Sequence, residues 1–249
     1  MESSIANEAV LTVLLFSTLA AGLAALGTLP FSLRERVPLK WIGWAYALAS
    51  GLMLGAGYIV MTEGLDRATL SVISGGGLGV AYTYWTQAYS GTTALATEPG
   101  DEFGAEYSVK FILQNAMHSA SEGVAIGVAM VVNLKLGIFM ALSLAVHNIA
   151  EAMVLTDVLR TRKMSIGECA GMCIVTNVPQ ILLAIVAFAV TPAIPGFLPW
   201  ALGFAAGALV YLVMTELLPS SYERAGHTGI AFVVSFATGG VVLVKGLFV

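Results

Sequence analysis

Two histidine–glutamate pairs stand in long apolar runs near the middle of the sequence. His118 is followed four residues later by Glu122, and His147 by Glu151. Residues i and i+4 lie on one face of a helix, so each pair presents an imidazole and a carboxylate in a common direction. Imidazole nitrogen and carboxylate oxygen suit Zn²⁺ and also Fe²⁺, Mn²⁺, Co²⁺ or Cd²⁺. The residue types and their spacing therefore predict a site for a divalent transition metal.

A short polar break at residues 133–135 separates the two apolar runs. Because His118 and His147 are about equally distant from it, an antiparallel helical hairpin would place both pairs at one depth, about 22 Å of helix from the turn. An intramembrane carboxylate or imidazole costs at least ~2.5 kcal/mol on insertion scales. A bound cation offsets that cost. Two buried ion pairs without a metal are the structural alternative.

The composition is that of an integral membrane protein. Of 249 residues, 58% are hydrophobic and 10% are charged, and the net charge is −4. Soluble domains are less apolar and carry more charge. No basic run predicts a nucleic-acid partner, so the expected partners are a divalent metal ion and the lipid bilayer. We expect a multi-pass protein of the plasma or inner cell membrane.

Apolar segments of about 20 residues recur along the chain, each long enough to cross a bilayer. We expect one all-α transmembrane domain covering residues 1–249, with an acidic cytoplasmic loop at 90–107. With both termini outside, eight Lys and Arg residues fall on the cytoplasmic side and three on the other, which favours that orientation. The eight expected spans are 9–29, 42–63, 69–89, 108–131, 137–159, 167–190, 199–218 and 228–248.

A repeated motif supports this topology. Residues 58–65, YIVMTEGL, and residues 211–218, YLVMTELL, are identical at six of eight positions. They end the second and seventh spans, which run in opposite directions in an eight-span chain. The match predicts an inverted repeat of spans 1–3 and 6–8 around the central hairpin, a 3+2+3 arrangement typical of transporters. Chance similarity between apolar helix ends is the alternative.

The central motifs resemble those of the ZIP (Zrt-/Irt-like protein) family of divalent metal transporters. Residues 118–123 read HSASEG and residues 147–152 read HNIAEA, whereas the family has His-Asn-x-Pro-Glu-Gly in its fourth helix and a His or Gln with a Pro-Glu-Gly-like ending in its fifth. The resemblance implies a divergent, prokaryotic-type member, a transporter and not an enzyme. It implies movement of Zn²⁺ or a similar ion toward the cytoplasm, between spans 2, 4, 5 and 7, with the ion as transported substrate.

Departures from the family pattern bear on the number of metals. The prolines before each Glu are absent, the Asn after the first His is Ser119, and a position often acidic in relatives is Asn148. The sixth-span Glu-Pro pair is replaced by Val178-Pro179, with Asn177 beside it. Neutral groups thus replace carboxylates that would hold a second ion, and we expect one main site. The predicted ligands are His118, Glu122, His147 and Glu151, assisted by Ser119, Asn148, Asn177, Asn115 and Glu216.

Two other functions fit part of the pattern. A membrane metal sensor or structural metal protein is one, because the motif prolines are missing. A membrane metalloenzyme is the other, but the chain has no His-Glu-x-x-His and no Glu-x-x-His motif. A homodimer is compatible with the sequence, since the glycines at 75–77 allow close packing of the third span.

Overall fold

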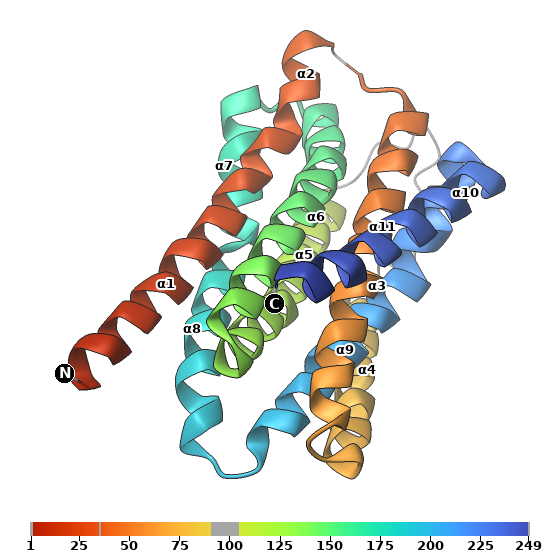
Figure 1. Cartoon of the computed structure of the whole chain (residues 1–249). Helices are drawn as coiled ribbons and strands as arrows, with labels where there is room; N and C mark the ends of the chain where they lie inside the picture. The colour runs from red at the N-terminus through yellow and green to blue at the C-terminus, as the bar shows by residue number, and fades with distance from the viewer. Residues whose placement is uncertain (1, 35, 91–104, 249) are drawn as a thin grey trace.

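The computed structural model describes residues 2–34, 36–90 and 105–248, and over these ranges every regular element is helical (Figure 1). The all-α class predicted from composition is confirmed. The elements are α1 (Glu2–Leu23), η1 (Ala24–Thr28), α2 (Leu29–Leu33), α3 (Leu39–Leu65), α4 (Thr69–Ser90), α5 (Ala105–Val132), α6 (Leu134–Thr161), α7 (Ile166–Thr176), α8 (Val178–Val190), η2 (Thr191–Ala193), α9 (Phe197–Leu212), η3 (Val213–Leu217), α10 (Leu218–Ala225) and α11 (His227–Phe248).

Six stretches of the described chain are long and apolar enough to cross a membrane. The remaining long helices, α4 and α5, have 22 and 28 residues but are less apolar. The sequence of α4 is rich in glycine, hydroxyl and tyrosine residues, and α5 carries half of the central polar motif. The six stretches are Asn7–Leu33, Leu39–Leu65, Leu134–Thr161, Ile166–Ala193, Phe197–Ala225 and His227–Leu247.

A hairpin of α5 and α6 organises the bundle. Only Asn133 separates the two helices, and its side-chain oxygen accepts a hydrogen bond of 2.8 Å from the backbone N–H of Lys135, which caps the start of α6. In Figure 1, α6 runs between α1 and α3, and it packs against both of them and against α5. The central motif therefore lies between α5 and α6, and other helices surround this pair.

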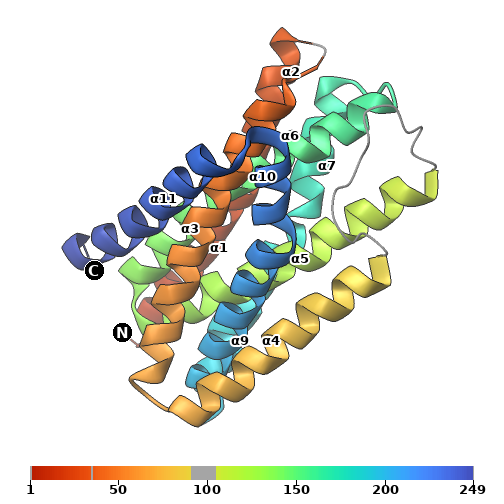
Figure 2. The same ribbon diagram turned by 90° about the vertical axis from the view of Figure 1, so that its right-hand side faces the viewer.

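The flanking helices pair in two matching ways. Helix α4 packs along α9, and α11 packs along α3 (Figure 2). Backbones in the first pair approach closely, because a Cβ built on Gly79 would collide with the carbonyl oxygen of Phe204, and one on Gly203 with that of Val72. Small residues at such contacts let membrane helices pack without side chains between them.

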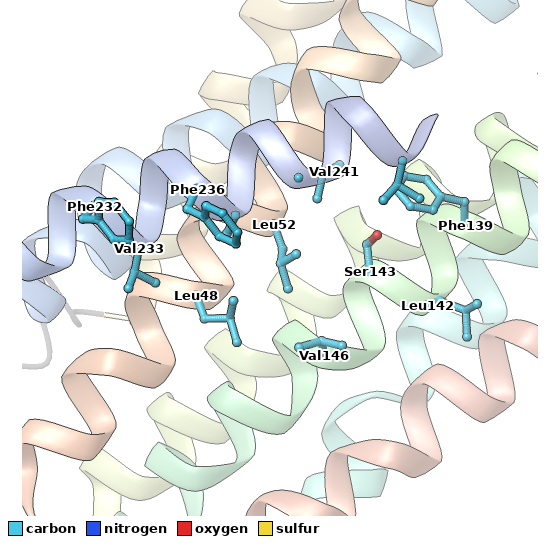
Figure 3. Close-up of a pocket in the computed structure, with 13 residues that line it drawn as sticks. Leu48, Leu52, Phe139, Leu142, Ser143, Val146, Phe232, Val233, Phe236 and Val241 are labelled. Carbon is cyan, nitrogen blue, oxygen red and sulfur yellow. The ribbon is translucent and has the colours of Figure 1, made fainter. Parts of the chain in front are cut away.

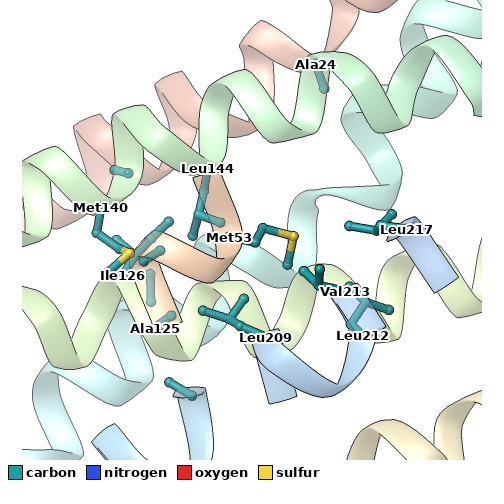
Figure 4. Close-up of a cluster of buried hydrophobic side chains, with 14 of the residues drawn as sticks. Ala24, Met53, Ala125, Ile126, Met140, Leu144, Leu209, Leu212, Val213 and Leu217 are labelled. Atoms are coloured by element: carbon teal, nitrogen blue, oxygen red, sulfur yellow. The ribbon is translucent and has the colours of Figure 1, made fainter. Parts of the chain in front are cut away.

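Buried apolar side chains fill the space between the central helices. Met53 of α3, Ile126 of α5, Leu144 of α6 and Leu209 of α9 are almost fully buried and gather in one cluster (Figure 4). In a bilayer, such clusters hold helices together by van der Waals packing and not by exclusion from water. The cluster fixes the positions of the helices that carry the polar motif.

A groove of about 610 Å³ lies between α3, α6 and α11 (Figure 3). Leu48, Phe139, Val146 and Phe236 are among the residues that line it, and Ser143 is the one side chain in its lining with a polar group. One hydroxyl, with no charged or imidazole group beside it, is a poor ligand set for an ion, so the predicted metal site is not expected in this groove.

Two boundaries differ from those expected. Residues 219–225 continue as the helix α10, although Pro219 and the polar residues after it predict a connecting loop. Proline is tolerated in the first turn of a helix, where its missing N–H leaves no hydrogen bond unmade. The expected acidic loop at 90–107 lies almost entirely outside the described residues, and α5 begins at Ala105.

Candidate metal centre

Four side chains of the central motif converge between α5 and α6. One ligand atom from each of His118, Glu122, His147 and Glu151 lies within 4.8 Å of the others. Glu122 is in the middle, because its Oε1 is 2.9 Å from His147 Nε2 and 3.3 Å from His118 Nε2. His147 Nε2 is also 3.8 Å from Glu151 Oε2. The hairpin therefore gathers the four residues whose spacing predicted a metal site.

The cluster is buried, with one more accessible side. Glu122 and His147 have 0% of their side chains exposed, whereas Glu151 has 12%. The two imidazole rings meet edge to face, with centroids 5.7 Å apart and planes at 73°. The cluster is therefore least enclosed on the side of Glu151.

The buried atoms of the cluster lack hydrogen-bond partners among the described residues. The atoms without a partner are both carboxylate oxygens of Glu122, both ring nitrogens of His147 and Nε2 of His118. The close Glu122–imidazole contacts satisfy an ion-pair distance but not hydrogen-bond geometry. Buried polar atoms are normally paired, and exceptions call for a ligand, water or ion. Two carboxylates and two neutral imidazoles fit a divalent cation in charge and in donor type.

Two of the predicted assisting residues support a break in a neighbouring helix. Helix α7 ends at Thr176 and α8 begins at Val178, so backbone carbonyls at the junction lose their usual partners. Asn177 donates from Nδ2 to the carbonyl oxygen of Cys173 at 2.8 Å, and Ser119 donates from Oγ to that of Thr176 at 2.7 Å. These side chains serve the helix break first, and only their oxygen lone pairs are left for an ion.

Asn148 connects α6 to two other helices. Its Nδ2 donates to Gln180 Oε1 at 2.8 Å and to the carbonyl oxygen of Ala20 at 3.3 Å. Three amide atoms here are buried without a hydrogen-bond partner among the described residues: Oδ1 of Asn148, Oδ1 of Asn177 and Nε2 of Gln180. This group of amides next to the cluster carries no charge. Gln180 follows Val178-Pro179 in the sequence, and its contact with Asn148 becomes visible only in the fold.

A second carboxylate position lies across a small cavity from the cluster. The cavity is lined by Tyr46, Gln114, Asn115, His118, Glu151, Leu212, Glu216 and Leu217. Asn115 and Glu216, both predicted from the sequence, therefore share a space with two members of the cluster, but they lie outside the group of four. Gln114 and Gln87 were not predicted, although a glutamine in an apolar run is itself a signal.

Glu216 is held by amides on a distorted turn. Its Oε2 accepts hydrogen bonds from Gln114 Nε2 at 3.0 Å and from Gln87 Nε2 at 3.3 Å. The segment Val213–Leu217 is a π-helical turn between α9 and α10. Such turns carry one extra residue and occur often at functional sites. The carboxylate is thereby fixed by neutral donors from α4 and α5.

Comparisons with known proteins agree with the geometry. The model of the family described as ZIP zinc transporters matches residues 106–244. A curated protein of Arabidopsis thaliana, named as an inferred zinc transporter, is 30% identical over 242 residues. That match covers 95% of this chain and 39% of the relative, so the chain spans about two fifths of the relative's length. Since the family model covers more than half of the sequence and includes both central motifs, the chain belongs to the ZIP zinc transporter family.

Proposed function

We propose that this chain carries a divalent transition-metal ion, Zn²⁺ first of all, across a cell membrane toward the cytoplasm. The observation that supports it is the convergence of four ligand atoms within 4.8 Å, most of them buried without hydrogen-bond partners among the described residues. The same ligands accept Fe²⁺, Mn²⁺, Co²⁺ or Cd²⁺, because nitrogen and carboxylate donors discriminate weakly among these ions.

The proposed site holds one ion. His118 and His147 each supply a nitrogen, and Glu122 and Glu151 each supply an oxygen, so two negative charges balance the ion's two positive charges. Ser119, Asn148 and Asn177 offer only neutral oxygens, which support a second ion poorly. The partly open side at Glu151 leads to Asn115 and Glu216, which would exchange ligands with an ion that moves between cluster and solvent.

The proposed arrangement has eight spans with both termini outside, and it includes α4 and α5 as the third and fourth. A 22-residue helix such as α4 is about 33 Å long, which matches a hydrocarbon core of about 30 Å. The matched pairs α4–α9 and α3–α11 support the 3+2+3 inverted repeat, because spans three and seven correspond to spans eight and two in such a repeat.

Zinc flux into proteoliposomes tests the proposal. Glu122→Gln keeps the shape of the side chain and removes its charge. We expect flux to fall at least about tenfold, because loss of even an outer-shell partner of a metal ligand commonly costs about 10–100-fold. Glu223→Gln is the matched control, because Glu223 is an exposed carboxylate on α10. Wild-type flux in the Glu122→Gln variant would exclude the cluster from the path.

Metal sensing or structural metal binding, without transport, is the second candidate function. Helices α5 and α6 are each 28 residues long and uninterrupted where the family has prolines. Straight helices leave fewer flexible points for opening and closing a path. Stoichiometric zinc binding that depends on Glu122, together with no flux in the same preparation, would favour this candidate.

A further inference from the structure

The repeated segments 58–65 and 211–218 share a glutamate, but the structure surrounds its two copies with different partners. Glu63 stands near the end of α3, and Glu216 stands at the equivalent place after α9. Both belong to the shared residues Tyr-x-Val-Met-Thr-Glu.

Two cations surround Glu63. Lys245 Nζ, from α11, is 2.8 Å from Glu63 Oε1, and Arg67 Nη1 is 3.3 Å from Glu63 Oε2. Arg67 also donates to the backbone carbonyl oxygen of Glu63. One carboxylate thus faces two positive groups. A divalent cation that approached it would meet like charge a few ångströms away, which opposes its binding.

Amides take the place of these cations at Glu216. Gln87 is the nineteenth residue of α4 and Lys245 is the nineteenth residue of α11, counted from Thr69 and His227. Because α4 packs along α9 as α11 packs along α3, Gln87 and Lys245 occupy corresponding positions. The residue that corresponds to Arg67, four positions after the glutamate, is Ser220. The two neutral donors to Glu216, Gln87 and Gln114, leave its negative charge in place.

The backbone that carries the two glutamates also differs. Helix α3 continues as a regular α-helix through Glu63 to Leu65, whereas the turn that carries Glu216 is π-helical. The extra residue of a π turn changes the direction of the side chains on it. Glu216 lines the cavity that also contains His118 and Glu151.

We propose that Lys245 and Arg67 are built-in counter-cations that keep metal ions away from Glu63. The repeat then uses its glutamate as an ion-binding group in one half and to join α3 to α11 in the other. The partners decide which role each glutamate has: Lys245 and Arg67 at Glu63, and Gln87 and Gln114 at Glu216. The role inferred for Glu216 rests on the proposed function, whereas the role inferred for Glu63 does not.

Exchanging the two partners tests the inference. We expect the double variant Lys245→Gln/Arg67→Ser, which gives Glu63 the residue types found at the corresponding positions of the other half, to add one weaker Zn²⁺ per chain in equilibrium binding. The triple variant that also carries Glu63→Gln should lose that ion again. Lys245→Arg keeps a cation beside Glu63 and should bind the same number of ions as wild type. We expect Gln87→Lys to slow zinc uptake about tenfold or more while Zn²⁺ affinity at the cluster stays within about twofold. Gln114→Lys brings a cation to Glu216 from a different helix and should act in the same way.

Three results would overturn the inference: no added zinc in a folded Lys245→Gln/Arg67→Ser variant, loss of a zinc in Glu63→Gln alone, or normal uptake with both Gln87→Lys and Gln114→Lys. Failure of the proposed function is distinguishable, because zinc binding would then be insensitive to Glu122→Gln whatever residue stands at 245 or 87.

Discussion

Glu122 is the residue on which the candidate centre depends. It is the one carboxylate in contact with both imidazoles, and it is fully buried without a hydrogen-bond donor among the described residues. A buried carboxylate in that condition destabilises the fold unless a cation accompanies it. The energetic link between metal binding and folding should therefore be concentrated in this side chain.

Zinc should stabilise the folded protein, and Glu122→Gln should remove that effect. A ligand that binds only the folded state adds about 2.7 kcal/mol to its stability at a concentration 100 times Kd. Thermal unfolding in detergent with zinc and with chelator measures the difference. His227→Asn, at an exposed position, should retain the full zinc-induced shift. An undiminished shift in Glu122→Gln would contradict the central position of this residue.

The four clustered residues could be predicted from sequence because helical spacing and the symmetry of a hairpin are local properties. The functions of Ser119 and Asn177 could not be predicted in the same way. Both donate to backbone carbonyl oxygens that lose their helical partners where α7 ends. The hydrogen bond from Ser119 forms only because α5 packs beside that break. A polar residue near a site is thus assigned correctly only when its hydrogen-bond partners are known.

At the scale of elements, α5 and α8 make a close contact next to Glu122. A Cβ on Gly123, the residue after Glu122, would collide with the carbonyl oxygen of Gln180, and one on Gly127 with that of Ala184. No side chain fits between the two helices at these points. The position of Glu122 relative to the amides on α8 therefore depends on glycine.

Gly123→Ala should separate α5 from α8 and harm both stability and metal binding. Overpacking of a tight contact typically costs about 1–3 kcal/mol. Gly171→Ala in α7 is a matched control, because a Cβ there meets nothing within 4 Å. Unfolding in detergent and zinc affinity are the two measurements. Equal stability and affinity in the two variants would show that the contact is not a constraint.

The two copies of the repeat have similar sequences but different backbone conformations. Six of eight residues are shared, yet α3 is a regular helix at Glu63 and the segment at Glu216 is a π turn. The two segments differ where this change occurs, because Leu217 stands at the position of Gly64 and Pro219 at that of Asp66. Their contacts differ too: Gly64 lies close to Leu202 of α9, whereas Leu217 belongs to the central apolar cluster.

At the scale of the whole molecule, composition predicted the all-α class, but it did not establish the number of spans. Helices α4 and α5 are long enough to cross a bilayer and are not among the six apolar stretches. Some of their polar residues face other helices in the bundle, as Gln87 and Gln114 do at Glu216. Hydropathy counts such residues as if lipid surrounded them, so it undervalues spans of this kind.

Single cysteines test the proposed orientation. Cys169 and Cys173 are buried, so the parent chain should react little with a membrane-impermeant maleimide. Asp66→Cys, in the exposed turn between α3 and α4, should react in intact cells, whereas Gly167→Cys, at the exposed start of α7, should react only after permeabilisation. The reverse pattern would contradict the outside location of both termini.

The single residue between α5 and α6 has a consequence for how the protein is made. With only Asn133 outside the two helices, α5 cannot be delivered to the membrane far from α6. On its own, α5 carries Glu122 and His118 into lipid without the histidine of its neighbour. We therefore expect the two helices to partition into the bilayer as a pair, with the metal ligands already facing each other, because inserting α5 alone would expose its polar groups to lipid.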